Sequence, residues 1–113
     1  MSSDAGGGIT SGYILDRVTV QPGRLGEYRE RVAREYLPQA LERGMTLVGS
    51  WIEPPLELQD ESNDLYLLWS FPEFWSMRRQ SREQGAAAWW EDSADLTVSR
   101  ERLFLAAAEL EAP

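Results

Sequence analysis

The sequence lacks cysteine, histidine and lysine altogether. Without cysteine it can form no disulfide, and without lysine it can form no Schiff base with a substrate or with pyridoxal phosphate. The lack of histidine and cysteine excludes the usual serine and cysteine triads, the typical zinc sites and the common axial ligands of haem. An all-carboxylate metal site stays open, but no spacing of acidic residues supports one. We therefore predict no cofactor and no metal.

Long apolar runs and an excess of basic charge are also missing. No run approaches the roughly 20 apolar residues of a membrane helix, and residues 1–8 contain neither the basic nor the apolar region of a secretory signal. We therefore expect a cytoplasmic protein with no membrane partner. The 19 acidic residues against 11 arginines give a net charge of −8, which repels nucleic acid. Nucleic acid is therefore not an expected partner.

The chain of 113 residues has room for one domain. We expect a flexible tail over residues 1–12, the domain over 13–108 and a short C-terminal tail over 109–113. Composition and turn residues predict strands over 13–20, 45–52, 65–71 and 98–107. Helices are predicted over 22–44 and 72–82, followed by a short helical segment over 86–95. The order βαββαβ is that of the ferredoxin-like α+β fold.

The first predicted helix has one apolar stripe. Pro38 is expected to kink this helix, and Gly44 is expected to end it. The residues of the stripe recur every three or four positions and are Leu25, Tyr28, Val32, Tyr36 and Ala40. The stripe therefore predicts the side of the helix that packs on the sheet.

Both faces of the central strands are apolar, although a sheet covered by helices on one face needs only one apolar face. In the third strand, one face carries Leu65, Leu67, Trp69 and Phe71, and the other carries Tyr66 and Leu68. In the second strand we expect Leu47 and Trp51 on one face, and Val48 and Ile52 on the other. Exposing four such side chains would cost on the order of 6–12 kcal/mol, comparable with the stability of a whole domain. We therefore predict that a second copy of the chain covers this face in a homodimer, with a different protein partner as the alternative.

Several short motifs, taken in order, resemble the NIPSNAP family. This family belongs to the dimeric α/β-barrel superfamily, together with cofactor-free antibiotic-biosynthesis monooxygenases and polyketide cyclases. The motifs are Pro22-Gly23, Tyr36-Leu37-Pro38, Gly49-Ser50-Trp51, Leu68-Trp69, Arg78 with Arg82, and Trp89 or Trp90. They span about residues 13–105 of the chain. The resemblance implies the barrel fold and says less about activity.

Asp16 is the first catalytic candidate. The family usually has an arginine at this position, six residues before the first proline, so the role of that arginine does not transfer. Asp16 shares its strand face with Ile14, Val18 and Val20, and burial among them would suit a carboxyl group to general acid–base work. The alternative, which we favour for this residue, is a structural ion pair with an arginine of the second helix.

Arg78 and Arg82 are the other two catalytic candidates. They lie one turn apart on the predicted second helix, on the same side as Phe74. Two guanidinium groups beside an aromatic ring could bind a carboxylate, a phenolate or a developing enolate. The alternative, which we weigh equally, is that they pair with Asp16 or Glu53.

The tryptophans are the main candidates for the walls of a binding pocket. If Trp51 and Trp69 both face the helices, they would enclose an apolar pocket between sheet and helices. Tyr66, Phe74 and Trp89 complete the predicted substrate-binding set. Trp89 and its neighbour cannot both face inward on a helix. The alternative, which we favour for these tryptophans, is plain core packing.

Two functions are compatible with these observations. The first is a cofactor-independent enzyme that oxygenates, cyclises or isomerises an apolar, aromatic or polyketide-like molecule, as in biosynthesis. Asp16 would then move a proton, and Arg78 or Arg82 would stabilise an oxyanion. The second is a non-catalytic homodimer that binds a ligand or a protein. A pocket reached by Asp16 and an arginine would favour the first function, and a filled core that ties them together would favour the second.

Overall fold

The computed structural model describes residues 12–72 and 84–110, with only the backbone of residues 84–87. The predicted N-terminal tail lies almost entirely outside the described residues, and so does the predicted second helix. None of the helices in the described ranges is long and apolar enough to cross a membrane.

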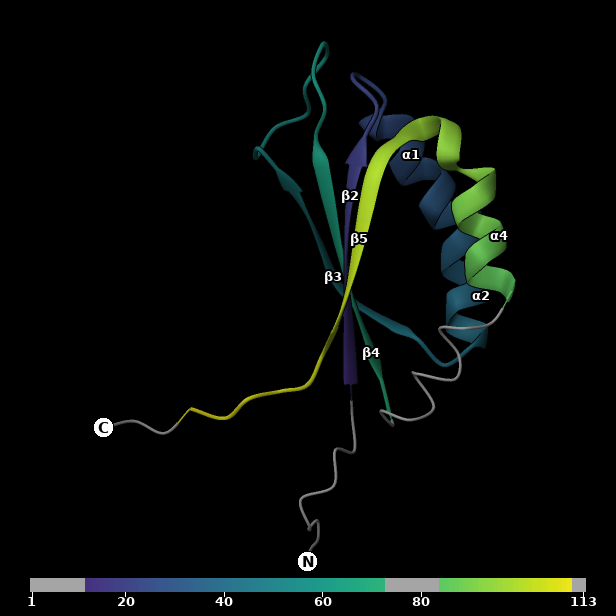
Figure 1. Ribbon diagram of the computed structural model, residues 1–113, viewed down its shortest axis with the longest axis vertical. Helices are drawn as coiled ribbons and strands as arrows, with labels where there is room; N and C mark the ends of the chain where they lie inside the picture. Colours follow the sequence, from purple (N-terminus) through teal and green to yellow (C-terminus); the bar gives the residue numbers. More distant parts are fainter. Residues whose placement is uncertain (1–11, 73–83, 111–113) are drawn as a thin grey trace, which may run out of the picture.

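Four antiparallel strands form one sheet in the order β3-β4-β2-β5. They are β2 (Gly12–Val20), β3 (Thr46–Glu53), β4 (Asp64–Phe71) and β5 (Thr97–Leu105). The helical segments are α1 (Leu25–Arg31), η1 (Val32–Tyr36), α2 (Leu37–Glu42), α4 (Gln84–Asp92) and η2 (Ala94–Leu96). Figure 1 shows α1, α2 and α4 on one side of the sheet, with the other side open. This arrangement confirms the predicted ferredoxin-like α+β fold, with each strand within two residues of its predicted bounds.

The first helix adjusts to its proline through a π-helical turn. Within η1, the backbone N–H of Leu37 bonds to the carbonyl of Val32, five residues earlier. Pro38 follows in the first turn of α2, where its missing N–H costs little. The predicted stripe on this helix, from Leu25 to Ala40, is buried in the core. Gly44 ends the helix with a φ of 90°, which favours glycine.

A β-bulge at Val48 changes the face on which Trp51 lies. Leu47 pairs with Trp69, but after the shift in register Trp51 pairs with Tyr66. Neighbours in register share a face, so Leu47 faces the helices and Trp51 faces the open side. The prediction that Leu47 and Trp51 share a face was therefore wrong, because one extra residue in a strand reverses the alternation that follows.

The open face of the sheet has an apolar part and a charged part. The apolar part consists of Tyr13, Leu15, Trp51, Leu68, Leu103 and Leu105, of which Trp51 is 54% exposed and Leu103 is 42% exposed. In the charged part, Arg17 forms an ion pair with Asp64 at 2.9 Å, and the Tyr66 hydroxyl donates to Glu53 at 2.7 Å. The predicted apolar character of this second face is confirmed for these strands.

Candidate functional site

Asp16 is held in a buried ion pair on the helix side of the sheet. Its side chain is 1% exposed, and both of its oxygens accept bonds from Arg102 of β5, at 2.7 and 2.9 Å. The indole Nε1 of Trp69 donates to the same carboxylate at 3.1 Å. The predicted apolar row on this strand face is confirmed, since Ile14, Val18 and Val20 are all fully buried.

The partner of Asp16 was not found from the sequence. The predicted alternative was an arginine of the second helix, whereas Arg102 lies directly opposite Asp16 in the pairing of β2 with β5. Burial by itself would lower the pKa of Arg102, but the bonds to Asp16 and its charge outweigh burial and raise that pKa. The geometry therefore matches a structural ion pair and leaves the carboxylate little freedom to move a proton.

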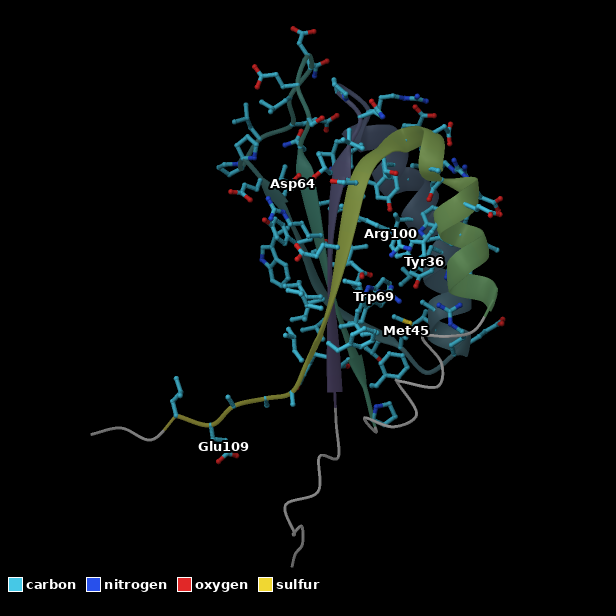
Figure 2. The ribbon with its side chains drawn as sticks, viewed as in Figure 1. Tyr36, Met45, Asp64, Trp69, Arg100 and Glu109 are labelled. Atoms are coloured by element: carbon cyan, nitrogen blue, oxygen red, sulfur yellow. The ribbon has the colours of Figure 1, made fainter. Side chains whose placement is uncertain are left out.

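Tyr36 connects this ion pair to a second guanidinium group, that of Arg43. Its buried hydroxyl oxygen accepts a bond from Arg43 at 3.1 Å and a longer one from Arg102 at 3.4 Å. The Arg43 guanidinium also lies over the Tyr36 ring, 5.6 Å from its centroid. Figure 2 shows Tyr36, Trp69 and Arg100 in the layer between the sheet and the helices.

A row of aromatic rings fills the space beside Tyr36. Tyr36 stacks on Trp89 with centroids 5.4 Å apart, and Trp89 lies 6.0 Å from Tyr28. The Tyr36 ring also lies 6.1 Å from that of Trp90, and Trp69 packs edge-on against it with centroids 5.6 Å apart. Trp89 is 3% exposed and Trp90 is half-buried. The expectation that only one of these adjacent tryptophans faces fully inward is confirmed.

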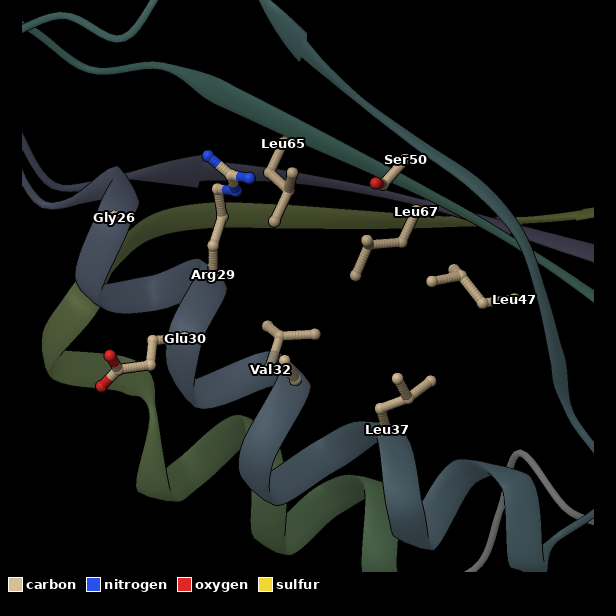
Figure 3. Close-up of a pocket in the computed structure, with 10 residues that line it drawn as sticks. Gly26, Arg29, Glu30, Val32, Leu37, Leu47, Ser50, Leu65 and Leu67 are labelled. Atoms are coloured by element: carbon tan, nitrogen blue, oxygen red, sulfur yellow. The ribbon is translucent and has the colours of Figure 1, made fainter.

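A separate groove of about 410 Å³ lies between the first helix and strands β3 and β4. Figure 3 shows Leu37, Leu47 and Leu67 pointing into it, with Arg29 near one end. Val32, Ala33 and Leu65 extend the apolar lining, and Glu30 and Ser50 add polar atoms. The volume lies within the range of about 300–1,000 Å³ typical of small-molecule sites.

The structure divides the predicted site residues into three groups. Trp69 and Trp89 lie buried with Asp16 on the helix side. Trp51 and Tyr66 lie on the open face, so they cannot wall a pocket together with Trp69, and this part of the prediction is corrected. Arg78, Arg82 and Phe74 lie outside the described residues. Glu53, the other proposed partner of the two arginines, binds Tyr66 on the open face.

Two features of the site were missed by sequence reasoning. The alternation along β5 places Arg100 and Arg102 on one face, but only the register with β2 brings Arg102 to Asp16. The lining of the groove was also missed, because the predicted pocket between sheet and helices had tryptophan walls, whereas leucines, Arg29 and Ser50 line the groove in the structure. Within the described ranges, no three acidic side chains gather closely enough to hold a metal ion.

Comparison with solved structures relates this fold to known proteins. A NIPSNAP-like domain protein from Burkholderia xenovorans superposes with a TM-score of 0.66 at 13% identity, covering 93% of this chain and 91% of that one. A NIPSNAP family protein of unknown function from Agrobacterium tumefaciens gives a TM-score of 0.64 at 14% identity, covering 91% and 93%. A Bacteroides thetaiotaomicron protein, provisionally named an antibiotic biosynthesis monooxygenase, gives 0.57 at 15% identity, covering 90% and 91%.

The chain therefore has the ferredoxin-like fold of these NIPSNAP proteins and of proteins provisionally named antibiotic biosynthesis monooxygenases. This confirms the predicted fold of the single chain, and the barrel formed by two copies stays a prediction. No protein-family model and no curated protein matches the sequence. At identities of 13–15% these likenesses concern the fold, so the function has to be argued from the site.

Proposed function

We propose that this protein is a homodimer that binds a flat, apolar small molecule in the groove between the first helix and strands β3 and β4. The groove carries the proposal, because it combines a sufficient volume with a mostly apolar wall to which four leucines contribute. Arg29 and Ser50 supply hydrogen-bond donors that suit a ligand with an oxygen at its edge. Among the described residues, Arg29 has no ion-pair partner that would occupy its guanidinium group.

The homodimer is proposed from the open face of the sheet. The apolar part of this face lacks any cover within the described residues, and the charged part beside it contains Arg17 together with Asp64 and Glu53. A face that carries both charges can complement itself across a two-fold axis. After Leu105 the chain runs away from the sheet, and residues 106–110 are all exposed (Figure 1). Such a segment suits packing on a second copy.

Binding without catalysis is the function that the geometry supports best. Asp16 is tied to Arg102 and Trp69, and the groove is lined by other residues. The second candidate is a cofactor-independent enzyme that oxygenates, cyclises or isomerises its ligand. It is favoured by the fold shared with proteins named as antibiotic biosynthesis monooxygenases.

The test of binding fills the groove with a larger side chain. Ala33 lines the groove and is exposed, so Ala33→Phe can occupy the space without removing an existing contact. Ala94 is also exposed and lies outside the groove, which makes Ala94→Phe the matched control. The probe is 1,4-naphthoquinone, followed by quenching of tryptophan fluorescence and by thermal melting monitored by circular dichroism.

We expect the quinone to bind saturably and to raise the melting temperature of the wild type and of A94F. A33F should bind it at least tenfold more weakly. Equal affinities in A33F and A94F would contradict the groove as the binding site. Incubation with the corresponding hydroquinone in air distinguishes the two functions, because only an enzyme accumulates an altered product that A33F fails to form.

A further inference from the structure

Two arginines of β5 lie on the face that packs toward the helices. Arg100 and Arg102 are two residues apart and pair in register with Val18 and Asp16 of β2. Both guanidinium groups lie over the indole of Trp90, at 4.1 and 5.4 Å from its ring centroid. Arg100 is exposed, so it forms the outer end of the aromatic row that leads inward to Tyr36.

The positive charge of this cluster is only partly neutralised. Asp16 pairs with Arg102. Arg43 has neutral partners, namely Gln39, Tyr36 and Met45, and Arg100 forms no ion pair within the part of the chain that the structure describes. Burial and the repulsion of Arg102 both lower the pKa of Arg100. The cluster thus contains three guanidinium groups and one carboxylate, in a chain whose net charge is −8.

The same cluster holds polar groups that lack a partner. The hydroxyl oxygen of Tyr36 accepts bonds from two arginines, while its hydrogen has no acceptor among the described residues. The Tyr28 hydroxyl and the Arg43 Nε are buried, and neither has a well-aligned hydrogen-bond partner among the described residues. Tyr28 belongs to this cluster through its ring, whose centroid lies 6.0 Å from that of Trp89 in the same aromatic row. Since buried polar groups are normally paired, donors left unpaired indicate a missing acceptor.

We propose that Arg100, Trp90 and the hydroxyl of Tyr36 belong to a second binding site, which takes a small aromatic carboxylate. The planar guanidinium group of Arg100 matches a carboxylate through two parallel hydrogen bonds. The indole of Trp90 and the rings behind it suit a flat ligand. Inorganic phosphate would be attracted only by the positive charge and should bind more weakly than an aromatic carboxylate, because it has no ring to stack on the indole. This site lies over β5 and is separate from the groove over β3 and β4.

The probe is benzoate, and benzamide is its neutral counterpart of the same shape. Isothermal titration should show saturable binding of benzoate at one site per subunit, and at least tenfold weaker binding of benzamide. Arg100→Gln should weaken benzoate binding at least tenfold. Arg34→Gln removes one positive charge from an exposed arginine of the first helix and should leave benzoate binding unchanged. Arg100→Lys keeps the positive charge but loses the planar guanidinium group. The affinity of R100K for benzoate should therefore lie between those of the wild type and R100Q.

The position of the ligand is tested separately. Benzoate should shift the indole N–H resonance of Trp90, assigned through Trp90→Phe, and the groove variant A33F should keep its benzoate affinity. Equal binding by wild type and R100Q, equal binding of benzoate and benzamide, or equal affinity for inorganic phosphate would each overturn the proposal. Loss of benzoate binding in A33F would also overturn it, because the carboxylate would then occupy the groove.

Discussion

The Asp16 carboxylate contributes to the fold mainly by neutralising a buried cation. In Asp16→Asn the Arg102 side chain, which is only 11% exposed, would lose its counter-charge. We expect D16N to lower the free energy of unfolding by about 3 kcal/mol or more. The measurement is urea unfolding followed by circular dichroism.

A double variant distinguishes the effect of removing the whole ion pair from the effect of leaving one charge unpaired. Asp16→Leu with Arg102→Met removes both charges and replaces them by apolar side chains. Its loss of stability should be well below the sum of the two single losses, since neither charge is left unpaired. Strictly additive losses would show that the two side chains act independently.

The Tyr28 hydroxyl has no well-aligned hydrogen-bond partner within the part of the chain that the structure describes, which predicts an effect on stability at neutral pH. An unsatisfied buried polar group costs about 1–3 kcal/mol, so removing it in Tyr28→Phe should raise the free energy of unfolding by about 1 kcal/mol. The ring keeps its contact with Trp89 in this variant. Thermal or urea unfolding at pH 7 measures the change, and a clear loss of stability would indicate that the hydroxyl has a partner.

The same residue predicts how stability depends on alkaline pH. Burial, and then the charge of Asp16, raise the pKa of Tyr28 above its ordinary value of 10.0. A group whose pKa is higher in the folded state contributes its full stabilisation below the pKa of the unfolded chain. This stabilisation is lost as the pH rises above about 10, because the Tyr28 hydroxyl ionises at a lower pH in the unfolded chain than in the folded protein. The stability of Y28F should therefore fall less steeply than that of the wild type between about pH 9.5 and 11.5.

At the scale of the strand, the position of the Trp51 ring in β3 depends on a glycine. A Cβ on Gly49 would lie 2.8 Å from the ring of Trp51, which therefore covers the backbone at this point. Gly49→Ala should displace the ring and lower stability by about 1 kcal/mol. In a Trp51→Ala background the same substitution should be neutral or stabilising, because alanine costs less than glycine in a strand. Unfolding of the four proteins checks this change of sign.

The positions of the strands could be predicted because β-branched and aromatic residues are bounded by turn residues. The face of Trp51 could not be predicted, because alternation assumes an unbroken register and the bulge at Val48 breaks it. The ion-pair partner of Asp16 could not be predicted for a related reason. Burial of Asp16 follows from its own strand, but its contact with Arg102 depends on how two strands far apart in the sequence align. Local sequence patterns therefore predict the strands and helices, whereas the contacts within the site depend on the pairing register between strands.

At the scale of the whole molecule, the open face of the sheet predicts how two copies meet. Leu103 lies on this face opposite Leu15, whereas Leu41 is an equally apolar and exposed residue on α2. If the sheets of two copies pack face to face, Leu103→Arg places two unpaired charges in the interface. Each charge would cost about 3 kcal/mol or more. Leu41→Arg adds the same charge on the helix side and serves as the matched control.

We expect light scattering after gel filtration to give a dimer for the wild type and for L41R at micromolar concentration. L103R should give a monomer, with a far-ultraviolet spectrum that shows the fold retained. If two copies exclude water from the apolar part of the sheet, the melting temperature of the wild type should rise with protein concentration, and that of L103R should not. A monomeric wild type would remove the homodimer from the proposed function and leave the groove to be tested on its own. If L41R dissociates and L103R remains a dimer, the helices and not the sheet form the interface.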